Sequence, residues 1–350
     1  MRSAMSRGGG VEPEMKAAFV KVPFQFELRD LPVIEPGPNE ALVRIRACGV
    51  CGTDLHIARK LAGDWCGIGH EMAGEVERVG SEVTRVKPGD KVVVENCTFC
   101  GVCANCKNGH VEQCLSWGMM GEQVGAAEYI TIRQSSLQTF EGIPFEHAAI
   151  CEPLGVALDV TAVADIPLNS TVCVMGPGPI GLMVVRIAKL KGAKTVILTG
   201  NSHSTRRLAV GREMGADRIV HVDKTNVVDW FKERYPDGID RVIVTSPPKT
   251  LLDAVKIANF GGVIAYIGID FGGEEMVTFD VNEIHFKRLQ IRASHAIPNL
   301  FFPIGLDLIR RKVIDASKMV THVFPLERAG EALVTAENDK ASVVKAVLVC

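Results

Sequence analysis

The stretch VCVMGPGPIGLMVVRIAKL, residues 172–190, decides the fold of the second half of this chain. An apolar strand pattern runs directly into three glycines, and a helical pattern follows them. The spacing G-x-G-x-x-G in that context is the dinucleotide fingerprint, in which the backbone approaches a pyrophosphate at a helix N-terminus. A glycine-rich turn without function is the alternative. We predict a nucleotide site formed by Gly176, Gly178, Pro179, Ile180 and Gly181.

Six apolar strand patterns alternate with helical stretches through this half of the chain. They read TVCVM, TVILT, RIVHV, RVIVT, GVIAYIG and LQIRA. Parallel neighbours need long crossover connections, so the alternation predicts an α/β Rossmann domain with a doubly wound parallel sheet of six strands. From Met15 to about Phe140 the pattern is short and β-like instead, which indicates a compact, irregular barrel.

The domain limits follow from these changes of pattern. Residues 1–14 are rich in Gly, Ser and Arg without periodicity, and we expect a disordered leader. The barrel domain is predicted to cover 15–155 and the nucleotide-binding domain 156–297. A helical pattern and a final strand pattern after Pro298 are expected to return to the barrel, so that 298–350 completes the first domain.

Composition excludes some classes of partner. The net charge of −2 and 23% charged residues argue against binding to nucleic acid, which needs a concentrated basic face. No apolar run is expected to reach the roughly 18 residues of a membrane span, and the first residues lack the apolar core of a secretory signal, so we expect a cytoplasmic protein without a membrane partner. Eleven cysteines in such a chain indicate metal ligands and buried thiols rather than disulfides. A small-molecule partner is expected.

The segment after the second strand of the predicted sheet lacks an acid. An NAD-preferring site usually carries an Asp or Glu there, about 20 residues after the glycines, for the ribose 2′-hydroxyl. From Leu182 to Arg212 the chain has neither. The segment offers space, hydroxyls and positive charge for a 2′-phosphate, so NADP is favoured over NAD. Both arginines could instead form the solvated start of a helix. The residues concerned are Gly200, Ser202, Arg206 and Arg207.

The stretch from Cys48 to Glu71 concentrates metal-binding side chains. Within it, Cys51, His70 and Glu71 supply the sulfur, nitrogen and oxygen donors that zinc accepts. Three protein ligands would leave a fourth position open, as catalytic zinc sites do.

A second group of cysteines lies in NCTFCGVCANCKNGHVEQC, at positions 97, 100, 103, 106 and 114. Four thiolates around one zinc ion make a closed site that stabilises a lobe without catalysing a reaction. Five candidates for four places leave the register open. An iron–sulfur cluster is the alternative, although the Cys-Pro ending of one common cluster motif is absent.

The chain resembles the zinc-dependent medium-chain alcohol and polyol dehydrogenases, in particular the sorbitol and threonine dehydrogenase branch. The motifs that carry the resemblance are GVCGTDLH, GHEMAGEVERVG, VKPGDKV, the cysteine lobe, CEPLGVALD and VMGPGPIGL. The resemblance implies that the barrel is a GroES-like catalytic domain. It also implies a lobe spacing of C-x2-C-x2-C-x7-C, with Cys97 as an extra thiol and a structural zinc held by Cys100, Cys103, Cys106 and Cys114.

On the same resemblance Cys51, His70 and Glu71 fall on the catalytic zinc motif, and Glu152 falls where alcohol dehydrogenases carry a cysteine ligand and polyol dehydrogenases an acid. Glu152 would bind the metal directly or through water, or merely cap a helix. Its carboxylate makes the pocket more polar than a thiolate would. This favours polyols, sugars or hydroxy-amino acids as substrates over simple apolar alcohols.

Thr53 matches the hydroxyl of the family's proton relay and His56 its imidazole, while Asp54 is suited to orient a ligand imidazole. Capping of a turn and surface exposure are the plain alternatives for the two relay residues. The expected function is hydride transfer between a secondary alcohol and NAD(P), with threonine-type and glucose-type dehydrogenases as alternatives within the family. A non-catalytic binding protein on this fold is the alternative of another class. The resemblance further implies a homo-oligomer, dimer or tetramer.

Overall fold

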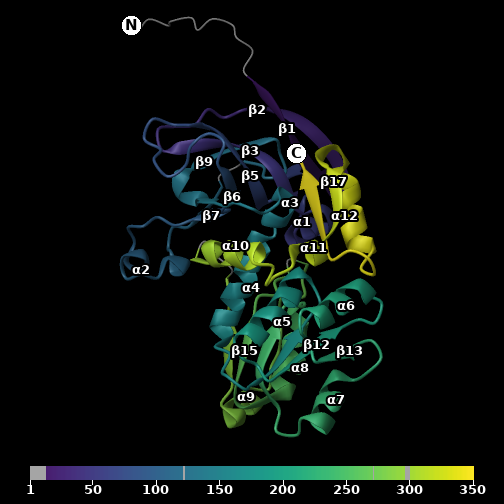
Figure 1. Cartoon of the computed structure of the whole chain (residues 1–350). Helices are drawn as coiled ribbons and strands as arrows, with labels where there is room; N and C mark the ends of the chain where they lie inside the picture. The colour runs from purple at the N-terminus through teal and green to yellow at the C-terminus, as the bar shows by residue number, and fades with distance from the viewer. Residues whose placement is uncertain (1–12, 121–122, 271, 296–299) are drawn as a thin grey trace, which may run out of the picture.

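A computed structural model of the chain describes residues 13–120, 123–270, 272–295 and 300–350. Figure 1 shows two halves, with helices α4 (Cys151–Ala164) and α10 (Phe302–Arg310) between them. The predicted leader lies outside the described residues except for its last two, and Glu14 already belongs to the first strand. The predicted domain limit at residue 298 also lies outside the described residues.

One half is built on a six-stranded parallel sheet in the order β13-β12-β11-β14-β15-β16. The prediction of a doubly wound sheet with six strands is therefore confirmed, and its order places β11 at the centre, as in dinucleotide-binding folds. The strands are β11 (Thr171–Met175), β12 (Thr195–Gly200), β13 (Arg218–His221), β14 (Ile239–Val244), β15 (Ala258–Tyr266) and β16 (Gln290–Ala293).

Apolar side chains of β11 point alternately to two layers of helices. Val172 and Val174 pack in a core that includes α4 and α5, whereas Cys173 and Met175 pack in a second core with α7 and α8. Burial on both faces explains why the strands read as unbroken apolar runs. The helices of this half are α5 (Pro179–Leu190), α6 (Thr205–Glu213), α7 (Val227–Arg234), α8 (Leu251–Ile257) and α9 (Val281–Lys287).

The other half is a barrel-like arrangement of three sheets. The largest sheet has seven strands: six follow the order β10-β6-β5-β3-β18-β17, and β9 pairs with β3 off this path. The strands β2-β1-β4 and β7-β8 form two smaller sheets. The bounds are β1 (Glu14–Lys21), β2 (Gln25–Pro32), β3 (Glu40–Gly49), β4 (Cys66–Gly67), β5 (Glu71–Val79), β6 (Lys91–Val94), β7 (Cys97–Thr98), β8 (Gly118–Met119), β9 (Tyr129–Arg133), β10 (Leu137–Thr139), β17 (Val320–Pro325) and β18 (Lys345–Val349).

The last strand lies beside the segment that leads into the metal-binding stretch. β18 pairs antiparallel with β3, so that Leu348 lies opposite Cys48 and Val347 opposite Gly49. The C-terminal segment thus joins the sheet of the N-terminal strands. Strand β17 and helix α12 were not expected from the sequence. The remaining helices are α1 (Gly52–His56), the π-helix η1 (Ile57–Leu61), α2 (Ala104–Lys107), α3 (Phe145–Ala148), α11 (Ala316–Met319) and α12 (Ala329–Asn338), with 3-10 turns η2 (Val111–Gln113), η3 (Gln134–Ser136), η4 (Pro248–Thr250) and η6 (Leu326–Arg328).

Helical residues 145–164 have the length and apolar composition of a membrane span, with a mean hydropathy of 1.3. The expectation that no apolar run reaches this length was therefore wrong for this segment. Acidic residues interrupt it, but they do not lower its mean hydropathy below that of a possible membrane span. However, 78% of that window is buried inside the protein, as in the core helix of a soluble protein, so the finding is weak evidence for a membrane.

Candidate metal centres and cofactor site

Three metal-binding side chains converge in the barrel half. The donor atoms of Cys51, His70 and Glu71 all lie within 4.8 Å of one another. Cys51 directly precedes α1, and Glu71 opens β5. Gly69 turns the chain between them with φ +90°, and a Cβ there would lie 2.4 Å from the backbone nitrogen of Ala126, so the turn requires glycine. Sulfur, nitrogen and carboxylate donors at this spacing fit a zinc ion.

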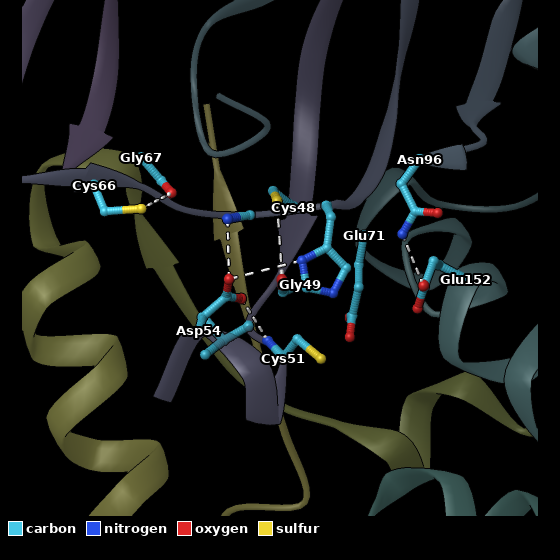
Figure 2. A network of polar contacts seen from close by, with 12 residues as sticks. Cys48, Gly49, Cys51, Asp54, Cys66, Gly67, Glu71, Asn96 and Glu152 are labelled. Atoms are coloured by element: carbon cyan, nitrogen blue, oxygen red, sulfur yellow. Dashed lines mark hydrogen bonds and ion pairs between the residues drawn. The ribbon is translucent and has the colours of Figure 1, made fainter. Parts of the chain in front are cut away.

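Asp54 ties together the two segments that carry these donors (Figure 2). Its carboxylate accepts hydrogen bonds from the backbone N–H of Cys51 at 2.8 Å and of Gly69 at 3.1 Å, and it is 2% exposed. It also lies 3.7 Å from Nδ1 of His70, close enough for electrostatic attraction but beyond a direct hydrogen bond. Asp54 therefore fixes the backbone on both sides of the centre, and its charge acts on the imidazole.

Groups that can carry negative charge surround the imidazole of His70 in this centre. Burial alone would lower the pKa of His70, but the charges of Cys51, Asp54 and Glu152 raise it well above its ordinary value. The same negative charges that hold a proton on the imidazole would hold a divalent cation in its place.

Lys345 is a buried counterion of this centre. Its Nζ lies 2.5 Å from Oε1 of Glu71 and donates to the carbonyl of Val50 at 2.8 Å. Lys345 and Glu71 are 4% and 1% exposed. Burial would lower the pKa of Lys345, but the Glu71 carboxylate outweighs it and raises that pKa. The protein itself thus balances the charge of Glu71, which leaves less of that charge for a metal.

The four cysteines predicted for a structural zinc also lie together, with all four Sγ atoms within 4.8 Å. Cys103 Sγ lies 3.5 Å from Cys106 Sγ, and Cys114 Sγ lies 3.5 Å from Cys100 Sγ. The backbone N–H of Cys100 donates to Cys114 Sγ at 3.2 Å and lowers the pKa of that thiol. N–H donors directed at sulfur favour thiolates, the form that binds zinc.

Cys97 lies outside this group of four, in strand β7. Burial, followed by the charge of Glu152, raises the pKa of its thiol to about 11, while the charge of His70 lowers it. Cys97 thus interacts electrostatically with the first centre. The geometry groups the same four cysteines as the C-x2-C-x2-C-x7-C spacing.

The glycine motif forms the turn between β11 and α5. Gly178 is the N-cap residue of α5, and Pro179 occupies the first turn. A Cβ on Gly181 would lie 2.0 Å from the carbonyl oxygen of Gly176, so this close helix–strand contact requires glycine. Above Gly178, by contrast, a Cβ would meet no atom within 4 Å. Open space at a helix N-terminus fits the pyrophosphate of a dinucleotide.

Two family models match this chain. Residues 37–141 match the family model of the alcohol dehydrogenase GroES-like domain, and residues 179–310 match that of the zinc-binding dehydrogenases. Sorbitol dehydrogenase of Bacillus subtilis (strain 168) is 30% identical, over 97% of this chain and 98% of that protein. The chain belongs to the zinc-dependent medium-chain dehydrogenases. The GroES-like barrel expected for the first half is thereby confirmed.

Two further relatives bear on the chemistry of this medium-chain dehydrogenase. L-threonine 3-dehydrogenase of Saccharopolyspora erythraea is 32% identical, over 91% of this chain and 94% of that protein. A zinc-binding dehydrogenase from Sinorhizobium meliloti 1021, solved bound to NADP, superimposes with a TM-score of 0.86 at 29% identity and covers 97% of this chain and 100% of that one. The protein is therefore an NAD(P)-dependent alcohol or polyol dehydrogenase that uses zinc.

Glu152 and Asn96 form a buried polar pair beside the group formed by Cys51, His70 and Glu71 (Figure 2). Glu152 Oε1 accepts a hydrogen bond from Asn96 Nδ2 at 2.9 Å, and Oδ1 of Asn96 has no hydrogen-bond partner among the described residues. Burial raises the pKa of Glu152 to about 7. The structure does not bring Glu152 into the group formed by Cys51, His70 and Glu71.

Thr53 and His56, predicted as proton relay, both lie on α1 directly after Cys51. Nδ1 of His56 is 3.2 Å from Nη2 of Arg59, and Arg59 forms an ion pair with Glu337 at 2.8 Å. Burial, and then the charge of Arg59, lower the pKa of His56. Arg59 can only donate, so Nδ1 accepts and the ring is neutral with its proton on Nε2.

Of the four residues predicted to bind the cofactor ribose, some lie beside the glycine turn or in solvent, while others are held by contacts with other segments. Gly200 ends β12 next to the glycine turn, since a Cβ there would lie 2.6 Å from Cγ of Pro177. Arg206 is exposed at the start of α6. Arg207 Nε instead donates to the carbonyl of Val343 at 2.7 Å, which ties α6 to the C-terminal segment. The predicted role of Arg207 is therefore less well supported by its contacts than that of Arg206.

Ser202 is held by an acid that the sequence analysis did not consider. Its backbone N–H and its hydroxyl donate to the two carboxylate oxygens of Asp223, at 2.7 and 2.6 Å. Lys345 and Asn96 were missed as well. Lys345 left a signal, because it is the single charged residue of SVVKAVLV, and a charge in an apolar strand requires a partner.

Substitution of Lys345 by methionine is expected to destabilise the dehydrogenase by about 3 to 5 kcal/mol, because it removes the buried ammonium group that donates to the Glu71 carboxylate and to the carbonyl of Val50. Urea unfolding of the metal-loaded protein measures the change. Lys249→Met is the matched control, since its 3.3 Å ion pair with Glu274 is exposed and should contribute less than about 1 kcal/mol. Equal stability of both variants would show that the buried pair does not stabilise the fold.

Proposed function

We propose that this dehydrogenase oxidises a secondary hydroxyl group of a polyol, or reduces the corresponding ketone, at a zinc ion held by Cys51, His70 and Glu71. Glu152 would complete the site directly or through water. A second zinc ion would be held by Cys100, Cys103, Cys106 and Cys114, which makes about two per chain. The convergence of three donors of different type in the barrel half carries this proposal.

When bound, zinc lowers the pKa of a hydroxyl group that it contacts, and the nicotinamide accepts the hydride. The residues of the chain orient the substrate and move its proton. Thr53 would accept the proton of the substrate hydroxyl and release its own hydroxyl proton. His56 would take up a proton at Nδ1 in place of its contact with Arg59 and release its Nε2 proton toward solvent. Lys345 holds the Glu71 carboxylate in place, and Asp54 holds the backbone at Cys51 and Gly69.

The polar side chains beside the proposed zinc ligands favour a polyol. Glu152 and Asn96 are 7% and 4% exposed, and between them they offer acceptors for further hydroxyl groups of a substrate. An apolar alcohol would leave these buried groups unsatisfied, at a cost in binding free energy. The similarity to sorbitol dehydrogenase supports this assignment. L-Threonine is the second candidate, because a carboxylate beside the reacting hydroxyl suits its ammonium group and a threonine dehydrogenase is a comparable relative.

We further propose that NADP is favoured over NAD. Two observations support this: no acid lies between Leu182 and Arg212, and the exposed guanidinium of Arg206 lies in the segment that follows β12. The NADP bound to the related zinc-binding dehydrogenase from Sinorhizobium meliloti adds support.

The same proposal includes a cytoplasmic location and a homo-oligomer. It also includes the domain limits predicted from the sequence, with one domain formed by 15–155 and 298–350 and the other by 156–297. None of the eleven cysteines forms a disulfide in the structure, which suits a reducing compartment. Strand β16 ends the parallel sheet, and nearby side chains of α9 are exposed, Val281 by 71% and Phe286 by 70%. An open sheet edge with apolar neighbours suits a contact with a second copy.

Initial rates with NAD and NADP test the proposal against sorbitol, related sugar alcohols, L-threonine and 2-propanol. We expect turnover of at least one sugar alcohol, with little activity toward 2-propanol. Turnover of L-threonine alone would favour the second candidate. Activity restricted to 2-propanol, or no turnover of any alcohol by protein with about two zinc ions, would contradict the proposal.

A further inference from the structure

An acidic side chain stands beside the proposed ribose site although the local sequence lacks one. Strands β12 and β13 are parallel neighbours, with Gly200 paired to His221, so the loops that follow them emerge at the same edge of the sheet (Figure 1). Asp223 lies in the second of these loops. Both of its carboxylate oxygens accept hydrogen bonds from Ser202 in the first loop, at 2.7 and 2.6 Å.

This position corresponds to the one that a cofactor ribose reaches. In dinucleotide-binding folds the pyrophosphate lies on the glycine turn after the first strand, and the adenosine ribose lies at the end of the second. Here the end of β12 touches that turn, because a Cβ on Gly200 would lie 2.6 Å from Pro177 Cγ. Asp223 thus brings a carboxylate from the third strand of the domain to the place where the second strand usually supplies one.

The charge of Asp223 is not balanced by the arginines predicted for this site. Hydrogen bonds from the side chain and backbone of Ser202 lower the pKa of Asp223 and keep it ionised. Arg207 is turned away to the carbonyl of Val343. Of the two arginines predicted for the ribose site, Arg206 is therefore the one whose side chain makes no such hydrogen bond with the described residues.

We propose that Asp223 is a cofactor-selectivity residue, which accepts a hydrogen bond from the ribose 2′-hydroxyl of NAD and repels the 2′-phosphate of NADP. Ser202 is its positioning residue, because both oxygens of the carboxylate are anchored there. The inference rests on the proposed dinucleotide site. The carboxylate of Asp223 weakens the preference for NADP that the segment after β12 would otherwise give. The protein therefore binds both NAD and NADP.

Binding of NADP and NAD to the zinc-loaded, full-length protein tests this inference without turnover. Isothermal titration calorimetry gives a dissociation constant for each cofactor in the wild type, Asp223→Asn and Asp237→Asn. Asp237 is the matched control, since it is exposed and precedes β14 at the opposite edge of the sheet. Removal of one like charge near the phosphate should tighten NADP binding about tenfold in Asp223→Asn and weaken NAD binding severalfold.

In Asp237→Asn neither constant should change by more than about twofold, since solvent and salt screen a charge at that distance. Ser202→Ala should reproduce part of the Asp223→Asn effect, because the carboxylate loses one anchor. Equal changes for both cofactors in Asp223→Asn, or no change, would overturn the inference while leaving the dinucleotide site intact. Failure of the wild type to bind either cofactor would instead refute the proposed function and the inference together.

Discussion

Substitution of Cys51 by serine is expected to lower turnover by roughly a thousandfold or more, because a cation lost from the centre no longer lowers the pKa of the substrate hydroxyl. A neutral hydroxyl is a much poorer zinc ligand than a thiolate, and the two remaining donors, His70 and Glu71, do not suffice for a stable site. The zinc content should fall to about one ion per chain, since the four cysteines of the lobe are untouched.

Elemental analysis and the rate of polyol oxidation measure both effects on the same sample. Cys66→Ser is the matched control: it makes the same atomic change at an exposed cysteine outside both donor groups, and should keep both zinc ions and normal turnover. If Cys51→Ser kept two zinc ions per chain and full turnover, Cys51 would have no part in the catalytic centre.

Thr53→Val is expected to lower turnover by about 10²- to 10⁴-fold with the zinc content unchanged, because it removes the hydroxyl that receives the substrate proton. Valine matches threonine in shape and in β-branching, so the first turn of α1 should be retained. Thr53→Ser keeps the hydroxyl and should recover most of the activity.

Thr161→Val provides the control for this second prediction. Thr161 is buried in α4, and its hydroxyl donates to the carbonyl of Ala157 at 2.9 Å, away from the proposed proton path. That variant should lose about 1 kcal/mol of stability and none of its turnover. Normal turnover of Thr53→Val would exclude Thr53 from proton transfer.

Local patterns in the sequence were sufficient to predict the parallel sheet and to locate both groups of candidate metal ligands, while the choice of four lobe cysteines among five came from the family resemblance. Strands buried on both faces read as apolar runs, so all six could be recognised. Cys51, His70 and Glu71 lie within one short stretch with motifs around them, and the lobe cysteines lie within another.

Contacts between distant segments could not be predicted in this way. Lys345 reaches Glu71 across 274 residues, through the pairing of β18 with β3. Asp223 reaches Ser202 because the parallel strands β12 and β13 end at the same edge of the sheet. The segment after β12 contains no acid, and its sequence gives no sign that the loop after β13 places one beside it. Arg207 is an opposite case. Its place in the sequence suggested a contact with a phosphate, but its side chain donates to the carbonyl of Val343 in a distant segment.

The most direct test of the central claim compares chelated protein with protein to which zinc has been restored. Initial rates of polyol oxidation at saturating NADP are measured on both, with circular dichroism to show that the fold persists. We predict that the rate falls below about 1% after chelation and returns when zinc is added. Chelated protein that stays folded, contains no zinc and oxidises the alcohol at the full rate would contradict a catalytic role for a cation at Cys51, His70 and Glu71.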